Sequence, residues 1–370
     1  MSKDVIKKRN TIDYALLLIT IAITFFGIYM VLSATFYSNI FDESNNPLNS
    51  FLSDFKKLFI AIGFMIVAIF FKFKFIKKLS PFIMLGSIVM LILTLAIGPN
   101  INGSNRWLMF GTFSFATAEF AKLAAILYFA RVLEDMKNND AQYQRGWINV
   151  LIFGGMSVGL IFVQPDLSTT VIYCLIIGAM LIVAGAKFKH LVLVILIGSM
   201  LLVAAIVAEP YRMQRVMGLL TEDTDFEGNN AQVNQSLLSI AEGNVFGVGA
   251  GKAVQTKYAM SQAESDFIFA TVAETTGFFG CVLLVTGYVF MLWRIFRAAL
   301  ITESRYASLV ITGVGTMIGF QALIHMLVNV KVIPVTGVTL PLVSSGGTSI
   351  LILLTSVGLV LNLTAHPEGI

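Results

Sequence analysis

Long apolar stretches of about twenty residues recur along the chain and alternate with short polar stretches. A stretch of this length matches the hydrocarbon core of a bilayer, which is about 30 Å thick. A membrane barrel would instead show short segments of alternating hydrophobicity. The pattern predicts an all-α, polytopic membrane protein that forms a single domain over residues 1–370. We expect about ten transmembrane helices, at 14–34, 57–73, 79–98, 116–134, 147–164, 167–186, 190–208, 266–293, 307–327 and 346–364.

Composition supports this class of protein. The 370 residues are 57% hydrophobic and only 12% charged, and their mean hydropathy is +0.84. A soluble domain would be about one-quarter charged. The first apolar stretch is longer than a signal peptide and lacks a small-residue cleavage site, so it predicts a first membrane helix. Both cysteines lie in apolar stretches without metal-ligand spacing, and no nucleic-acid partner is expected.

Basic residues occupy every second connection between the predicted helices, which places them on one side of the membrane. They are Lys3, Lys7, Lys8, Arg9, Lys72, Lys74, Lys77, Lys78, Arg131, Lys137, Arg145, Lys187, Lys189, Arg294, Arg297 and Arg305. The positive-inside rule makes this side cytoplasmic, together with both termini. The opposite connections are then extracytoplasmic, at 35–56, 99–115, 164–166, 209–265 and 328–345.

Three carboxylates lie in the stretch 258–280, where a polar segment enters a long apolar helix. Glu264 and Asp266 stand at the mouth of this helix and Glu274 stands two turns further in. Because a carboxylate at membrane depth is costly, each needs a partner or a function. Asp266 is the leading catalytic candidate, and Glu274 is expected to be a buried, hydrogen-bonded support.

Other charged residues gather on the same predicted side. Arg106 is either a loop charge or a site residue. Glu119 and Lys122 share a helix face, so they either neutralise each other or leave Lys122 facing a cavity that accepts an anionic head group. Asp166 is either a helix cap or a second carboxylate that binds a metal ion or orients a cation. Arg212 and Arg215 suit either a phosphate site or an interfacial pair.

Two extracytoplasmic loops have distinctive patterns. Loop 209–265 carries apolar residues at helical spacing, so we expect short amphipathic helices on the outer membrane face. Its sequence GVGAGK at 247–252 lacks the first glycine and the Ser/Thr of a phosphate-binding loop, and we interpret it as a tight turn. Loop 328–345 is rich in Pro and Gly, which predicts a non-helical, partly re-entrant segment buried in protein. His325, just before it, is expected to be a satisfied buried histidine.

The order of short motifs resembles that of the SEDS family (RodA, FtsW and SpoVE), over nearly the whole chain. NGSNRWL resembles the family's N-G-x-x-R-W-I, AEFAKL resembles S-E-[FL]-A-K-L, and QPDLST resembles Q-P-D-L-G-T. SDFIFA resembles T-D-F-I-F-A, and PVTGVTLPLVSSGGTS resembles P-x-T-G-x-x-L-P-F-x-S-Y-G-G-S-S. The chain departs from the family where P-E-x-H-T-D becomes SQAESD and where S-Y-G-G becomes SSGG. Glu264 is a candidate substitute for the lost glutamate.

The resemblance implies a ten-span peptidoglycan glycosyltransferase of the bacterial cytoplasmic membrane that polymerises lipid II with a class B penicillin-binding protein. It places the catalytic aspartate at Asp266 and further functional positions at Arg106, Glu119, Lys122 and Asp166. We hypothesise that Asp266 is a general base and that Lys122 and Arg106 stabilise the leaving pyrophosphate, with a divalent cation (Mg²⁺ or Mn²⁺) held by Asp166. The alternatives are a transporter or flippase of lipid-linked precursors and a non-catalytic scaffold for a penicillin-binding protein.

Overall fold

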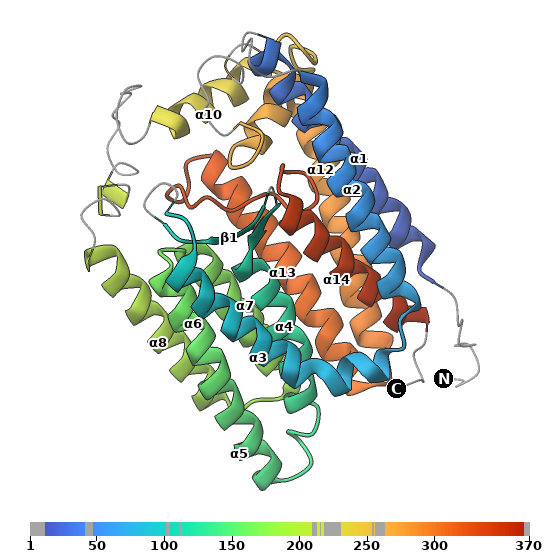
Figure 1. Cartoon of the computed structure of the whole chain (residues 1–370), viewed down its shortest axis with the longest axis vertical. Coiled ribbons are helices and arrows are strands. Elements are labelled where there is room, and N and C mark those ends of the chain that lie inside the picture. Colours follow the sequence, from blue (N-terminus) through green and yellow to red (C-terminus); the bar gives the residue numbers. More distant parts are fainter. Residues whose placement is uncertain are drawn as a thin grey trace.

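The computed structural model describes residues 12–40, 47–100, 104–111, 113–208, 213–214, 216–217, 231–253, 255 and 263–365. Long helices pack side by side, and α10 lies across one end of them (Figure 1). The first helices are α1 (Tyr14–Ile40), α2 (Pro47–Phe70), α3 (Phe73–Ile97) and α4 (Thr117–Leu133). Then follow α5 (Asp140–Asn149), a π-helical turn η1 (Val150–Gly154), α6 (Gly155–Val163), α7 (Leu167–Ala184) and α8 (Phe188–Ala208). The last are α10 (Ala231–Glu242), α12 (Ile268–Ile301), α13 (Arg305–Asn329) and α14 (Gly347–Ala365).

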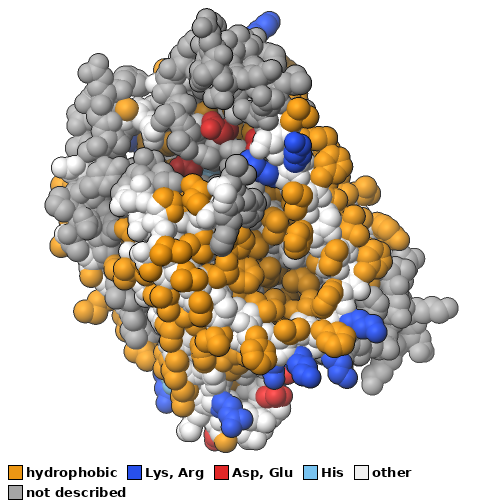
Figure 2. Space-filling model, in the orientation of Figure 1, with side chains coloured by type: hydrophobic (Ala, Val, Ile, Leu, Met, Phe, Trp, Pro, Cys, Tyr) orange, Lys and Arg blue, Asp and Glu red, His pale blue; other side chains and the backbone are white. Residues whose placement is uncertain are grey.

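The predicted transmembrane segments coincide with helices. Among the described residues, seven helical segments are long and apolar enough to cross a membrane. They are Tyr14–Thr35, Phe73–Ile97, Asp140–Val163, Leu167–Ala184, Ile268–Ile301, Arg305–Asn329 and Gly347–Ala365. The other three predicted spans fall on α2, α4 and α8, and the total of ten stays a prediction. Figure 2 shows hydrophobic side chains over the middle of one face and Lys and Arg near its lower end, as expected of a multi-pass membrane protein.

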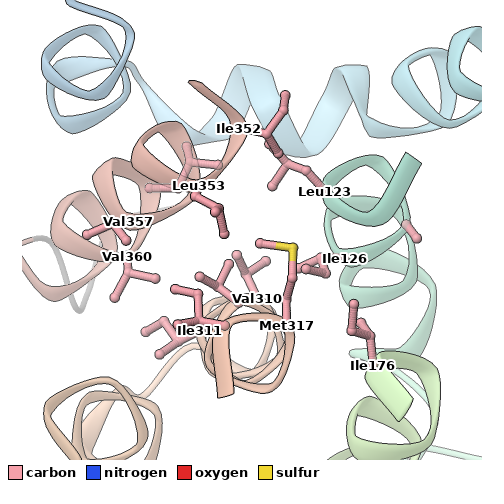
Figure 3. Packing of buried hydrophobic residues seen from close by; sticks show 14 of the residues in the cluster. Leu123, Ile126, Ile176, Val310, Ile311, Met317, Ile352, Leu353, Val357 and Val360 are labelled. Carbon is pink, nitrogen blue, oxygen red and sulfur yellow. The ribbon is translucent and has the colours of Figure 1, made fainter. Parts of the chain in front are cut away.

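Helix α13 lies at the centre of the core. Its buried Val310, Ile311 and Met317 face α4, α7 and α14, from which Leu123, Ile126, Ile176, Leu353 and Val357 point toward it (Figure 3). Close packing is helped by Gly313, where a Cβ would lie 2.8 Å from the side chain of Ile126. Helix α13 is therefore held on several sides by close-packed side chains.

Ion pairs fix the helix ends that are remote from α10. Asp13 accepts a hydrogen bond from the main-chain N–H of Leu16 and also receives Arg294 Nη2 at 2.6 Å. Lys77 pairs with Glu134 at 2.7 Å and thereby joins the start of α3 to the end of α4. Both pairs involve residues that the sequence places on the cytoplasmic side.

A short β-hairpin corrects the purely helical prediction. Strand β1 (Trp107–Phe110) pairs antiparallel with β2 (Phe113–Ala116), with Trp107 opposite Ala116. Thr348 ties the hairpin to the start of α14, because its hydroxyl donates to the carbonyl of Ser114 at 2.9 Å. The alternation of apolar and small residues over so few positions gave no distinct strand signal. The hairpin positions Arg106, which directly precedes β1.

Helix α10 confirms a helix in loop 209–265 but not its predicted packing. Its buried residues are Val233, Asn234, Gln235, Ser236 and Ser239, whereas Leu238 is exposed. Ser236 donates to the carbonyl of Asn329 at 2.9 Å, and Lys331 donates to Asn234 at 3.0 Å. The end of α13 and Lys331 after it thus provide partners for two of these polar residues, and α10 packs on the protein through this face.

Helix α12 is broken at Gly277, whose φ of 67° and ψ of −163° are not helical. Residues 244–249 fill the break. The main-chain N–H groups of Val248 and Gly249 donate to the carbonyls of Glu274 and Thr275, and those of Phe278 and Phe279 donate to the carbonyls of Asn244 and Val245. Two carbonyls and two N–H groups beside the break thus find partners outside the helix. The glycines at 247, 249 and 251 have positive φ, which confirms the predicted tight turn.

The segment between α13 and α14 is non-helical and enters the core, as predicted. Leu340, Leu342 and Val343 are buried, and Tyr288 of α12 donates a hydrogen bond to the carbonyl of Pro341. Helix α1 approaches closely at Gly27, where a Cβ would lie 2.5 Å from Val343 Cα. Irregular main chain is thus enclosed by helices, which is the condition under which it is tolerated at membrane depth.

Candidate functional site

Asp266 lies in the turn that leads into α12, two residues before the helix begins. Its side chain is partly exposed, whereas Phe267 and Ile268 behind it are buried. The apolar sequence FIFA continues as the buried first turn of α12 and leaves the carboxylate at the helix mouth. Acidic side chains are visible in a hollow in the upper part of the face in Figure 2, near the end that carries α10.

The side chains of Arg106 and Asp266 both approach Gly337 in the 330–346 segment. A Cβ on Gly337 would lie 3.5 Å from Asp266 Oδ2 and 3.6 Å from Arg106 Nη1. Gly337 has a φ of 69°, a conformation that favours glycine. Three segments far apart in the sequence therefore place a carboxylate and a guanidinium around a small, uncrowded point. Arg106 thus lies beside the candidate catalytic residue, and its role as a site residue stays a prediction.

Asp166 is the N-cap of α7, and it also lies beside Arg106. Its Oδ1 accepts from the N–H of Thr169 at 3.1 Å and its Oδ2 accepts from the hydroxyl of Thr169 at 2.9 Å. Arg106 Nη2 donates to the carbonyl of Pro165 at 2.5 Å, and Arg106 Nε lies 3.9 Å from Asp166 Oδ2. The predicted helix cap is therefore confirmed, while orientation of a cation by Asp166 stays a prediction.

Glu119 and Lys122 form a buried ion pair. Lys122 Nζ lies 2.7 Å from Glu119 Oε1 and 2.9 Å from Gln321 Oε1, and its side chain is only 1% exposed. The alternative in which Lys122 faces an open cavity is therefore wrong for this structure, because the ammonium is enclosed by its partners. Gln321 donates in turn to the carbonyl and the hydroxyl of Thr339 at 3.2 Å. The pair thus supports the segment that carries Gly337.

The other two carboxylates of the 258–280 stretch have different surroundings. The carbonyl of Glu264 accepts from the N–H of Ser345 at 2.8 Å, and its side chain is partly exposed. Glu274 is fully buried, and its Oε1 accepts from the N–H of Gln255 at 3.0 Å. The prediction of Glu274 as a buried, hydrogen-bonded support is confirmed. Arg212 and Arg215 lie outside the described residues.

The prediction for His325 holds for one ring nitrogen. Nδ1 pairs with the carbonyl of Val338 at 2.7 Å, whereas the buried Nε2 has no hydrogen-bond partner. Sequence reasoning missed Gln321, Asn329 and Gly337, which link α13 and its following segment to the site. The family motif P-x-T-G could have indicated Gly337, but a Gln and an Asn within an apolar helix gave no specific signal.

A cavity adjoins the site on the other side of the 344–347 segment. It is a partly open pocket between α1, α2 and the start of α14. Val31, Leu58 and Val343 contribute apolar walls, and Lys57 and Ser345 contribute polar groups. Lys57 is paired with Asp54 at 2.7 Å. Polar and apolar surfaces thus meet close to the residues that precede Asp266.

Comparison with known proteins identifies the family. The model of the FtsW, RodA and SpoVE family of cell cycle proteins matches residues 14–368. The chain belongs to this family, the SEDS family. The resemblance drawn from the short motifs is therefore confirmed.

Named relatives extend along almost the entire SEDS chain. Stage V sporulation protein E of Bacillus subtilis is 33% identical over 365 residues, which cover 97% of this chain and 98% of that protein. A probable peptidoglycan glycosyltransferase FtsW of Thiomicrospira cyclica is 33% identical over 359 residues, or 95% of this chain and 91% of the relative. The similarity is therefore not confined to the motifs.

Solved structures share the fold of the SEDS chain. A chain from a peptidoglycan synthase complex that coordinates polymerization and crosslinking superposes with a TM-score of 0.78 at 25% identity, covering 96% of this chain and 98% of that chain. The rod shape determining protein RodA of Thermus thermophilus gives a TM-score of 0.72 at 26% identity, covering 97% of this chain and 98% of that chain.

Proposed function

We propose that this SEDS protein is a peptidoglycan glycosyltransferase that polymerises lipid II at the outer face of the bacterial cytoplasmic membrane. Family membership and relatives named as peptidoglycan glycosyltransferases support the reaction class. The observation that carries the assignment to residues is the approach of Asp266 and Arg106 to the same point beside Gly337. A carboxylate and a guanidinium at one uncrowded position suit a transfer that releases an anionic group.

Asp266 acts as the general base in this proposal. Its carboxylate accepts the proton of the acceptor's 4-hydroxyl as that oxygen attacks the anomeric carbon of the donor sugar. The new glycosidic C–O bond forms while the bond from the anomeric carbon to the pyrophosphate oxygen breaks. The electron pair leaves with undecaprenyl pyrophosphate, so a single displacement converts the α-linkage of the donor into a β-1,4 linkage.

Arg106 stabilises the leaving pyrophosphate, on which negative charge develops. The bond to the carbonyl of Pro165 and the nearby Asp166 carboxylate hold the guanidinium in place before substrate arrives. A donor that is fixed in advance stabilises transition-state charge without reorganisation during the reaction. Asp166 therefore contributes by orienting Arg106.

The Glu119–Lys122 pair acts through the 330–346 segment. Lys122 reaches Thr339 through Gln321, and Thr339 stands two residues after Gly337. A buried ion pair with satisfied hydrogen bonds is rigid, and removal of one partner leaves an unpaired charge. The pair therefore helps to fix the position of this segment, and with it the position of Gly337 beside Asp266 and Arg106.

The divalent cation expected at Asp166 does not fit the donors found there. Both carboxylate oxygens of Asp166 already accept hydrogen bonds from Thr169, and Arg106 is the nearby charge. Among the described residues, no group of three or more His, Cys, Asp and Glu side chains forms a metal site. Hard cations such as Mg²⁺ require several oxygen ligands.

We propose that the start of the substrate's polyprenyl tail lies against the apolar walls of the pocket between α1 and α2, next to its polar groups. A class B penicillin-binding protein is the proposed partner, as the related chain belongs to a complex of polymerization and crosslinking.

The cytoplasmic placement of the basic connections puts both termini inside and Asp266 outside. Lipid II is presented on that outer side.

Polymerisation of purified lipid II, with and without a class B partner, tests the proposal. We expect glycan strands from the wild type and a loss of about 10²–10⁴-fold in rate for Asp266→Asn, the usual contribution of a general base. Asp140→Asn, an exposed carboxylate at the start of α5, is the matched control and should retain activity. A folded Asp266→Asn variant with wild-type activity would overturn the assignment of the base.

The same experiment separates the alternatives. A wild type that moves labelled lipid II across vesicle membranes without forming polymer would favour the flippase. A wild type that binds the partner, makes no polymer and supports growth equally well as Asp266→Asn would favour the scaffold.

A further inference from the structure

Three consecutive main-chain carbonyls around the catalytic candidate accept hydrogen bonds from the α13 end and the segment after it. The carbonyl of Glu264 accepts from the N–H of Ser345 at 2.8 Å. The carbonyl of Ser265 accepts from the hydroxyl of Ser344 at 2.7 Å. The carbonyl of Asp266 accepts from Asn329 Nδ2 at 3.1 Å. A turn that would otherwise be irregular is thus fixed residue by residue.

Asn329 also performs the task of a helix cap from another element. The N-cap residue of α12, Phe267, has no side chain able to accept a hydrogen bond from the first turn. Asn329 Oδ1 accepts from the N–H of Ala270 at 3.1 Å instead, at the position that an N-cap side chain normally serves. One amide therefore satisfies a donor of the first turn of α12 and the carbonyl of Asp266.

The amide of Asn329 is itself held in a single orientation. Its Nδ2 also donates to the carbonyl of His325 at 2.9 Å, and its main-chain carbonyl accepts from Ser236 of α10 at 2.9 Å. Asn329 is fully buried, so these bonds form away from bulk water. An amide with both ends engaged cannot rotate without leaving a buried group unpaired.

We infer that Asn329 is a positioning residue for Asp266, and that the hydroxyl of Ser344 assists it. This inference rests on the proposed function, since it assigns the residues that aim the proposed base. Ser344 accepts from the N–H of Leu340 at 2.7 Å while it donates to Ser265, so it links the Gly337 segment to the same turn. The carboxylate of Asp266 and the glycine it faces are therefore set by one hydrogen-bonded unit.

A matched pair of asparagines provides the test. Asn362 on α14 is also buried and donates to two main-chain carbonyls, of Ala68 at 2.9 Å and Phe71 at 2.7 Å, both at the end of α2. We expect Asn329→Ala to lower kcat for lipid II polymerisation about 10- to 100-fold with KM changed less than about 3-fold, because a small displacement of a catalytic group costs this much. Asn362→Ala should leave kcat within about 3-fold of the wild type.

The serine provides a milder pair if Asn329→Ala fails to fold. Ser344→Ala should lower kcat, and Ser344→Thr, which keeps the hydroxyl, should restore it. Equal losses of kcat in Asn329→Ala and Asn362→Ala, or in Ser344→Ala and Ser344→Thr, would overturn the inference and leave only a structural role.

Hydrogen–deuterium exchange of the intact protein tests the hydrogen bonds that Asn329 makes with the 264–270 segment, independently of activity. The amides of residues 264–270 should exchange faster in Asn329→Ala than in the wild type and should be unchanged in Asn362→Ala. Unchanged exchange in Asn329→Ala would overturn the inference even with an active enzyme. An inactive wild type whose exchange follows the expectation would overturn the proposed function but leave the positioning of Asp266 by Asn329 supported.

Discussion

At the scale of single residues, the site depends on the absence of a side chain at Gly337. Its positive φ and the proximity of two candidate functional groups to its missing Cβ are separate requirements, and a second glycine can distinguish them. Gly111, in the hairpin turn, has a similar φ of 63° but no atom within 4 Å of a Cβ. Alanine at either position carries the same main-chain cost of about 1–2 kcal/mol.

We therefore expect Gly337→Ala and Gly111→Ala to lower thermal stability to a similar extent, and only Gly337→Ala to lower polymerase activity. The added methyl would lie between Asp266 and Arg106, where the acceptor hydroxyl and the leaving group must meet. The measurements are unfolding in detergent and the lipid II assay. Equal activity of the two variants would contradict the position proposed for the reacting atoms.

Burial decides what the Lys122 ion pair contributes. Because its ammonium is enclosed, Lys122→Met leaves Glu119 unpaired in a poorly hydrated environment and should cost about 3–5 kcal/mol. The double variant Lys122→Met with Glu119→Gln should recover much of this loss. Lys187→Met is the control, since its pair with Asp140 is exposed and worth at most about 1 kcal/mol. Similar unfolding temperatures for Lys122→Met and Lys187→Met would contradict this account.

At the scale of elements, periodicity predicted most of the helices because long apolar stretches have few alternatives in a membrane. It located the turn at 164–166 and the irregular segment after α13, both of which have strong Pro and Gly signals. It missed the break in α12, since TTGFFG reads as a continuous apolar helix. It also missed the packing of α10, since polar residues such as Asn234 and Ser236 become core residues only when partners from other elements satisfy them.

The candidate site, like the helices, could be predicted only in part. Asp266, Arg106 and Asp166 could be predicted because charged residues beside membrane helices stand out and match family motifs. Their mutual arrangement could not be predicted, because it depends on Gly337 and Asn329, which lie more than sixty residues from Asp266 in the sequence. The enclosure of Lys122 likewise depends on Gln321, from another helix.

The break in α12 is testable with two glycines, Gly277 at the break and Gly178 within α7. A Cβ at Gly277 would lie 2.3 Å from the main-chain nitrogen of Gly247, whereas a Cβ at Gly178 in α7 meets nothing within 4 Å. We expect Gly277→Ala to destabilise the protein strongly by displacing residues 244–249. Gly178→Ala should be neutral or stabilising by up to about 1 kcal/mol. Limited proteolysis within 244–249 and thermal unfolding would reveal the difference. Equal stability would show that the break is not required.

At the scale of the whole molecule, two interhelical ion pairs and the candidate site lie at opposite ends of the helix bundle. Ion pairs with Lys77 and Arg294 lie at one end, and Asp266 lies at the other. This arrangement fits an enzyme whose substrate is presented on the outer side, with basic residues anchoring the inner side.

Labelling of single cysteines tests this orientation. In a variant without Cys174 and Cys281, we expect a membrane-impermeant maleimide to label Phe246→Cys on intact cells. Asp140→Cys should react only after the membrane is permeabilised. Both positions are exposed on the protein surface, so access is set by the side of the membrane. The opposite result would invert the topology and remove the site from the outer face.

The main-chain hydrogen bonds between residues 244–249 and α12 have a consequence for the order of folding. The segment is synthesised before α12, yet its hydrogen-bond partners are exposed only once that helix is made and bent at Gly277. A continuous helix would satisfy Phe278 and Phe279 internally, so the two arrangements compete for the same main-chain groups. We expect these hydrogen bonds to form late, after the neighbouring helices have assembled. Maturation of this end of the protein is then a separate step from membrane insertion.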